Sequence, residues 1–255
     1  MNSMSNILDY PRLVFLLSFI VLWASTLLGV LLRRKRGPLD QDQREDFGVV
    51  QSAILTLLSL LIGFTFSMAL GRYDQRKNYE EAEANAIGTE YVRADLLPAA
   101  DGARVRELLK SYLDQRMRFY TTRDLRQDQQ IDIRTTQLQN DLWSVVRGSA
   151  AAQPTLPVTL AVSGMNDVLN SQGYTQAAWS YRIPAEAWDL MMLIAIACTL
   201  LFGYNARRSG KYLFLVLPFA IAVSFFLIAD VDSPRRGLVS VYPQNLLSLS
   251  QTLTK

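Results

Sequence analysis

The sequence contains no histidine and only one cysteine, Cys198, among its 255 residues. One thiol forms no disulfide within the chain, and the Cys and His ligands of structural zinc sites are missing. Catalysis by a histidine base is excluded too, and no glycine-rich phosphate loop is present. We therefore expect no catalytic residues, no metal site and no cofactor, and we predict that the protein is not an enzyme.

Charge is absent from long stretches of the chain. Residues 13–32, 47–70 and 212–229 carry none, and residues 187–206 carry only Asp189. About 20 residues of helix cross the roughly 30 Å hydrocarbon layer of a bilayer. We therefore predict an integral membrane protein with four transmembrane helices, at 13–32, 47–70, 187–206 and 211–229.

The first apolar run is predicted to be a retained anchor. A signal peptide carries its positive charge before a shorter apolar run and has a cleavage site after it. Here the basic residues Arg33–Arg36 follow the run, and no small-residue cleavage site is visible.

The region between the second and third spans is polar, and its apolar residues recur at helical spacing without strict alternation. Helices are predicted around 105–117, 131–146 and 158–180, with residues 148–157 as a linker. The fold class is therefore predicted to be all-α. The predicted domains are an N-terminal transmembrane hairpin (1–70), a helical extramembrane region (71–186), a C-terminal transmembrane hairpin (187–230) and a tail (231–255).

The net charge of +3 is small and the basic residues are scattered, which does not suggest a nucleic-acid surface. Positive residues favour the cytoplasmic side of a membrane. The two short connections hold eight Lys and Arg residues near span ends, and the opposite side holds seven. This count does not decide the orientation, although the dense cluster Arg33–Arg36 favours the short connections inside.

The second span continues without proline into one of the most charged segments of the chain, so a single helix is predicted to run out of the membrane. At about 100° per residue, five small or hydroxyl-bearing residues share one narrow face of this span. They are Ser52, Thr56, Ser59, Gly63 and Ser67. Such a face is typical of close helix packing in lipid, and a water-facing role is equally open.

Beyond this span, Arg76 with Glu80 and Lys77 with Glu81 are spaced as i,i+4 pairs, which are typical of a solvated helix surface. Arg72 and Arg76 lie one turn apart, directly beyond the apolar residues. In a ring of copies they would surround one mouth with positive charge and concentrate anions. In a monomer the same residues would anchor the helix at the membrane interface.

Two segments resemble the bestrophin-like family, and most closely its bacterial branch. The denser match is residues 63–98, GFTFSMALGRYDQRKNYEEAEANAIGTEYVRADLLP, and the other is residues 232–247, DSPRRGLVSVYPQNLL, after the fourth span. The second segment is similar in position and shape to the Pro-Phe-Gly segment of bestrophins. Between the two segments, only the four-span plan and the helical middle region carry the resemblance.

The resemblance implies a pentameric anion channel, of chloride type, that conducts passively through an axial pore lined by the second span. Placing Gly63-Phe64 on the Gly-aromatic pair at the neck of bestrophins puts Arg72-Tyr73 on a second shared pair without a gap. The pore-lining residues are then expected to be Thr56, Leu60, Gly63, Phe64 and Ser67, with Arg72 and Arg76 at an anion-attracting mouth. Thr56 is polar where bestrophins are apolar, which weakens the case for a tight hydrophobic gate.

The resemblance also implies a protein of the cell membrane whose helical region is cytoplasmic. Its expected partners are the lipid bilayer, small anions and further copies of the chain. The acidic run that holds calcium in animal bestrophins is replaced here by Asp230 and Asp232 followed by two arginines, so no such calcium site is expected.

Two other functions stay open from the sequence. A membrane-anchored sensor or scaffold would bind a ligand or a protein through the helical region without conducting ions. An enzyme within the membrane is the weaker of the two, because the chain lacks histidine and a reactive thiol.

Overall fold

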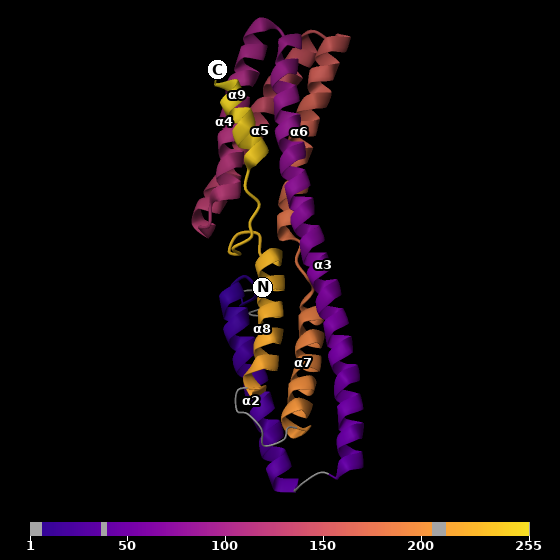
Figure 1. Ribbon diagram of the computed structural model, residues 1–255. Helices are drawn as coiled ribbons and strands as arrows, with labels where there is room; N and C mark the ends of the chain where they lie inside the picture. Colours follow the sequence, from indigo (N-terminus) through magenta and orange to yellow (C-terminus); the bar gives the residue numbers. More distant parts are fainter. Residues whose placement is uncertain (1–6, 37–39, 206–212, 255) are drawn as a thin grey trace. The chain divides into compact units, whose positions relative to one another are not determined.

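The computed structural model describes residues 7–36, 40–205 and 213–254 (Figure 1). All regular secondary structure in these ranges is helical, which confirms the predicted all-α class. The elements are α2 (Pro11–Arg36), α3 (Gln41–Arg93), the short 3-10 helix η1 (Ala94–Leu96), α4 (Ala99–Thr121), α5 (Leu125–Ala152), α6 (Leu156–Ser180), α7 (Ala185–Asn205), α8 (Leu213–Asp232) and α9 (Gln244–Leu253).

Four helical stretches are long and apolar enough to cross a membrane. They lie within Pro11–Lys35, Gln41–Leu96, Leu156–Asn205 and Phe214–Asp232. The prediction of four transmembrane helices is therefore confirmed, and the protein is an integral membrane protein.

Helix α3 is one unbroken helix of 53 residues, as the absence of proline predicts. At 1.5 Å per residue it is about 80 Å long, more than twice the thickness of the hydrocarbon layer. Its charge-free part, residues 47–70, matches that layer on its own. The charged remainder up to Arg93 is therefore expected to extend beyond the membrane.

The chain forms two compact units. The first contains Met1–Arg72 and Arg182–Ser240, and the second contains Tyr73–Tyr181 and Val241–Lys255. Helix α3 contributes to both units. The domain limits drawn from the sequence, at residues 70, 186 and 230, stay predictions.

In the first unit, α2 packs against α7 and α8. The contact with α7 depends on two glycines, because a Cβ at Gly203 would collide with the carbonyl of Thr26, and one at Gly29 would collide with the carbonyl of Leu200. The Ser25 hydroxyl also donates a hydrogen bond of 3.0 Å to the carbonyl oxygen of Ile196. Small residues and a hydroxyl contact of this kind are how helices associate in lipid, where no hydrophobic force draws them together.

In the second unit, α4, α5 and α6 pack side by side in sequence order, and α9 lies against α4 (Figure 1). Fully buried apolar side chains from these helices fill the centre, among them Leu109, Leu142 and Met165. At one end of the cluster, the rings of Phe119 and Tyr120 contact the Trp179 ring, with centroid distances of 4.8 and 5.4 Å.

The linker predicted at residues 148–157 is wrong for most of its length. Helix α5 continues to Ala152 and α6 begins at Leu156, so the connection contains only residues 153–155. The run of three alanines at 150–152 favours helix more strongly than any other residue type. Ser149 is also buried, and its hydroxyl donates a 2.6 Å hydrogen bond to Asp101 on α4, which holds this last stretch of α5 in the bundle.

The α2–α7 contact can be tested by comparing a crowded glycine, Gly203, with an uncrowded one, Gly148. We expect Gly203→Ala to destabilise the protein by about 1–3 kcal/mol, because the added methyl group has backbone atoms in its place. Gly148→Ala is the matched control on α5, where a Cβ has nothing within 4 Å. It should stabilise the protein by up to about 1 kcal/mol through helix propensity. Denaturant unfolding of both variants in detergent measures the difference, and an equal effect of the two would contradict the close contact.

Candidate pore helix and its buried anchors

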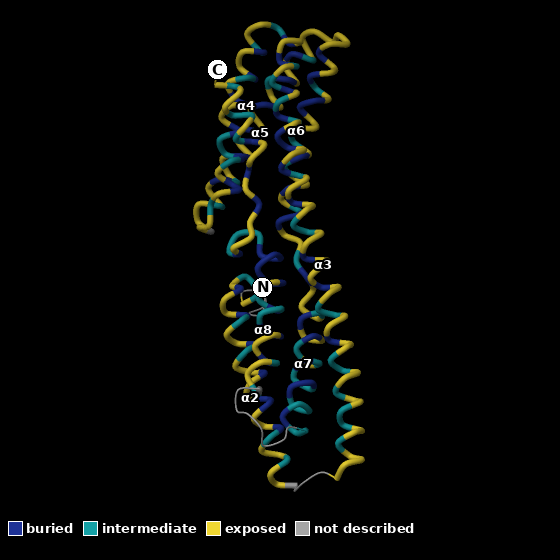
Figure 2. The backbone as a smooth tube through the Cα atoms, in the orientation of Figure 1, coloured by how far each residue is buried: buried dark blue, intermediate teal, exposed yellow. Residues whose placement is uncertain are grey.

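The charge-free part of α3 is the least covered of the apolar helices. Figure 2 shows most of it exposed, with only scattered buried residues. Three side chains of residues 47–70 are buried: Leu58, Thr65 and Ala69. The residues expected to line a pore are all exposed: Thr56, Leu60, Gly63, Phe64 and Ser67.

The buried and exposed residues of this stretch lie on different sides of the helix. At about 100° per residue, Leu58, Thr65 and Ala69 share one side. Thr56, Leu60 and Gly63 fall on the opposite side. A Cβ at Gly63 would have nothing within 4 Å, so this side is open within one chain.

Two of the hydroxyl groups near this side form hydrogen bonds within the helix itself. Thr56 donates a hydrogen bond of 2.8 Å to the Ser52 carbonyl, and Ser59 donates one of 2.8 Å to Leu55. Bonds from Ser or Thr to the carbonyl four residues earlier are a common way to carry a hydroxyl in a helix. This side can therefore face either lipid, another helix or water.

The two arginines expected at the mouth have different surroundings. Arg72 is half-buried and forms no ion pair with the described part of the chain. Arg76 is buried, and its guanidinium donates hydrogen bonds of 3.2 Å to the carbonyl of Ala178 and 3.3 Å to that of Tyr181. These carbonyls end α6, where positive charge is favourable. Arg76 thus has a structural role, and its part in a mouth stays a prediction.

Glu80 is not the solvated partner of Arg76 that the i,i+4 spacing predicts. Its carboxylate is buried and accepts backbone hydrogen bonds from Asn245, at 2.9 Å, and Leu246, at 3.0 Å, and a third bond from the Asn245 side chain, at 2.6 Å. These two amides lie in the first turn of α9, whose preceding residue Pro243 supplies no side-chain cap. Glu80 therefore caps α9 from another helix and fixes the C-terminal segment to α3.

One turn further along α3, Glu83 forms a buried ion pair with Arg116 of α4, and both side chains are inaccessible to water. Glu83 also accepts hydrogen bonds from the Tyr120 hydroxyl, at 3.1 Å, and the Thr175 hydroxyl, at 3.2 Å. The Arg116 guanidinium lies 4.4 Å from the centre of the Phe119 ring. This cluster joins α3, α4 and α6 through one carboxylate.

The buried charge of Glu83 sets the ionisation of the two side chains beside it, Tyr120 and Arg116. Burial, together with the negative charge of Glu83, raises the pKa of Tyr120 above its usual range, so Tyr120 stays a hydrogen-bond donor. Burial by itself would lower the pKa of Arg116, but the charge of Glu83, its hydrogen bond to Arg116 and the neighbouring Tyr112 and Tyr120 together outweigh burial and raise that pKa. Arg116 is therefore ionised and Tyr120 is neutral throughout the physiological pH range.

The sequence carried a signal for this cluster that spacing alone could have revealed. Arg116 follows Leu109, Tyr112 and Leu113 at helical spacing, so it lies on the apolar face of α4. A charged residue on such a face needs a buried partner. The partner could not be named, because Glu83 lies 33 residues away along the chain.

The segment after α8 is held by carboxylates in the first unit. Asp230 accepts backbone hydrogen bonds from Leu238, at 2.7 Å, and Val239, at 3.0 Å. Arg182 contacts Asp9 and lies 3.4 Å from Asp232. Among the described residues, no group of three or more His, Cys, Asp or Glu side chains could hold a metal ion.

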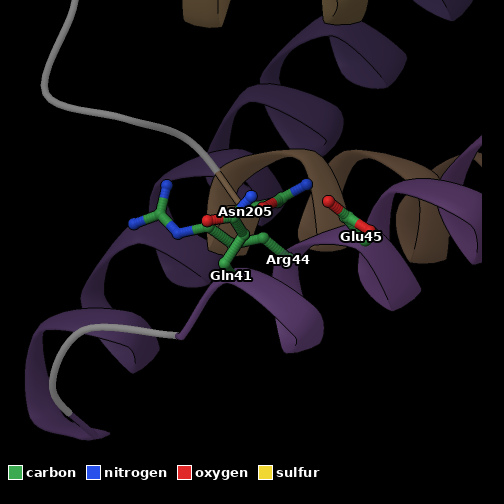
Figure 3. Close-up of a pocket in the computed structure, with 4 residues that line it drawn as sticks. All are labelled: Gln41, Arg44, Glu45 and Asn205. Atoms are coloured by element: carbon green, nitrogen blue, oxygen red, sulfur yellow. The ribbon is translucent and has the colours of Figure 1, made fainter.

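A polar hollow of about 670 Å³ lies in the first unit (Figure 3). It is lined by Gln41, Arg44 and Glu45 at the start of α3 and by Asn205 at the end of α7. Neighbouring Asp40 already caps the start of α3, because its carboxylate accepts the Gln43 amide at 2.8 Å. The hollow therefore offers no open helix end for an anion.

The sequence profile of the Bestrophin-like domain matches residues 18–246. The chain belongs to the Bestrophin-like family. The resemblance seen in residues 63–98 and 232–247 is thereby confirmed. No curated protein sequence gives a significant match.

Solved structures agree with this family. A bacterial bestrophin homologue from Klebsiella pneumoniae is 12% identical, with 92% of this chain and 98% of that chain covered and a TM-score of 0.61. A variant of that homologue is 13% identical, with 94% of this chain and 96% of that chain covered and a TM-score of 0.64. A variant of a protein described as a membrane protein is 12% identical, with 93% of this chain and 96% of that chain covered and a TM-score of 0.66. At these identities the similarity establishes a bestrophin-like membrane fold.

The Glu83–Arg116 pair of this bestrophin-like protein can be tested by removing one charge. Arg116→Met leaves a buried carboxylate without its partner and should lower the free energy of unfolding by about 3–5 kcal/mol. Glu83→Gln combined with Arg116→Met should lose less, because no charge is left buried. Arg104→Met is the control, since its ion pair with Glu107 is exposed and such pairs contribute about 0–1 kcal/mol. Equal losses for Arg116→Met and Arg104→Met in denaturant unfolding would contradict a strongly coupled pair.

Proposed function

We propose that this protein is an oligomeric, pentameric channel that passes chloride-type anions passively along an axis lined by α3. The observation that carries the proposal is the exposure of α3. Thr56, Leu60 and Phe64 lie on surface that one chain leaves open, while the opposite side of the same helix is buried. Several copies arranged around an axis would cover that surface and enclose a passage.

The neck of the proposed pore is formed by Thr56, Leu60 and Phe64, one turn apart. Phe64 is 61% exposed and Leu60 53% exposed, so both are free to project toward an axis. A ring of such side chains forms an apolar constriction, which can close by losing its water. Thr56 keeps one level of the neck polar, while Gly63 and Ser67 leave room beside it.

Selectivity in the proposed channel comes from the arginines beyond the neck. Arg72, with Arg76 one turn further, would repeat in each subunit and give one mouth a positive potential that concentrates anions. Arg76 supports this mouth by holding the end of α6. Residues 71–186 and the tail 231–255 are proposed to lie outside the membrane, on the cytoplasmic side.

Anion flux into liposomes tests the pore. Phe64→Ala should raise chloride flux several-fold by widening the constriction. Phe66→Ala is the matched control, because Phe66 is also exposed but lies about 160° around α3 from Phe64, and it should change the flux little. Arg72→Glu should lower the preference for anions over cations, whereas Lys77→Glu, an exposed reversal further along α3, should leave it nearly unchanged.

Absence of flux from all of these proteins, with folding and a pentameric mass confirmed, would refute the channel. Attention would then move to a sensor or scaffold that binds through its helical region. Equal effects of Phe64→Ala and Phe66→Ala would instead refute the assignment of the neck while leaving a channel in place.

The orientation can be measured with single cysteines in a Cys198→Ala background. Gln153→Cys places a thiol in the exposed connection between α5 and α6, and Asp42→Cys places one in the exposed first turn of α3. In intact cells, a membrane-impermeant maleimide should label the cysteine at 42 and should label the one at 153 only after lysis. The reverse pattern would contradict a cytoplasmic helical region.

A further inference from the structure

Glu90 is the most unusual carboxyl group of the second unit. It lies on α3 20 residues beyond Leu70, outside the charge-free stretch that spans the membrane. The side chain is fully buried, and neither carboxyl oxygen has a hydrogen-bond partner. The other buried glutamates of this helix, Glu80 and Glu83, are each satisfied by several donors.

The carboxyl group of Glu90 packs against the backbone of α6 at Gly164. A Cβ at this position would collide with the Glu90 Oε2 atom, and it would come 2.5 Å from the Arg93 Nη1 atom. The absence of a side chain at Gly164 therefore leaves the space that the ends of the Glu90 and Arg93 side chains occupy between the two helices. The contact leaves no room for a water molecule to satisfy Oε2 on that side.

Few charged groups surround this contact. Arg93 on α3 and Asp167 on α6 are the charges close enough to act on Glu90, and neither forms an ion pair with it. On α4, Arg106 and Lys110 lie over the Tyr91 ring instead. Helix α9, whose Leu249 contacts Gly88, carries no charged residue.

These surroundings favour the neutral acid. Burial raises the pKa of Glu90 from 4.5 to about 8, with Arg93 lowering it and Asp167 raising it by smaller amounts. At neutral pH the carboxyl group therefore keeps its proton. An ionised carboxylate in the same place would be buried without any donor, which is strongly unfavourable.

We propose that Glu90 and Gly164 form a proton-controlled contact between α3 and α6, closed when Glu90 is protonated and loosened when it is ionised. Ionised Glu90 requires donors, and the nearest is the Arg93 guanidinium, which lies against the same glycine. Pairing with it moves both side chains against Gly164, and admitting water to the carboxylate needs more space between α3 and α6 at this glycine. The proposal concerns the helical region alone and does not depend on conduction through α3.

The sign of the pH effect follows from proton linkage. The pKa is higher in the folded protein than in the unfolded chain, so the folded state binds more protons between pH 4.5 and about 8. The contribution of Glu90 to stability is fully present below pH 4.5. It is lost as the pH rises through this window and changes no further above pH 8.

The test compares the full-length protein with Glu90→Gln, which keeps the shape of the side chain and removes its titration. The free energy of unfolding of the wild type should fall from pH 6 to pH 9 relative to Glu90→Gln. Glu81→Gln is the control, because Glu81 is exposed on the same helix and should retain the wild-type profile. The same pH profile for Glu90→Gln and the wild type would overturn the proposal.

Two further measurements address the contact directly. Hydrogen exchange, corrected for its intrinsic pH dependence, should become faster at pH 9 in peptides containing residues 86–97 and 160–168 of the wild type but not of Glu90→Gln. Asp167→Asn should shift this transition to lower pH, since it removes a negative charge that raises the pKa of Glu90. Unchanged exchange at pH 9 in the wild type would show that the contact does not open and would overturn the proposal.

Discussion

Beyond its charge-free stretch, helix α3 carries three buried glutamates, Glu80, Glu83 and Glu90. Each buried carboxyl group needs hydrogen-bond donors, a counter-charge or a proton, and the second unit is organised around these three needs. Glu80 accepts two amides in the first turn of α9, Glu83 accepts the guanidinium of Arg116, and burial without a donor raises the pKa of Glu90. A buried carboxylate is tolerated only with donors or a counter-charge. These needs bring α4, α6 and α9 to fixed places along one helix, and the apolar core fills the space between them.

Much of the fold could be read from local features of the sequence. The four spans follow from stretches without charge, and the length of α3 follows from the absence of proline. The roles of its charged residues could not be read in this way, because the nearest candidate partners along the helix are not the partners used. Glu80 has Arg76 one turn away, yet it bonds to Asn245, which is 165 residues distant. Local spacing suggested that Glu80 pairs with Arg76, and each of the two instead bonds to a residue distant in the sequence.

The candidate pore residues came from a resemblance, and the sequence by itself left their face equally open to packing or to water. The structure adds that Leu58, Thr65 and Ala69 occupy the covered side of α3 while Thr56, Leu60 and Phe64 do not. Periodicity could not supply this distinction, since both sides of the helix are apolar with interspersed small residues. The burial of Glu90 could not be predicted for a related reason, because in the sequence it is one acidic residue among many in a charged helix.

The unbroken course of α3 constrains how its sequence can change over evolution. Point substitutions alter one contact at a time, but a single inserted or deleted residue between Leu70 and Glu80 would turn everything beyond it by about 100°. Glu80, Glu83 and Glu90 would then all face the wrong neighbours at once. Insertions of 7 or 11 residues, close to two or three whole turns, would preserve their direction but displace them by about 10–16 Å along the axis. Length in this part of the helix is therefore expected to be far less variable among descendants of this gene than residue identity.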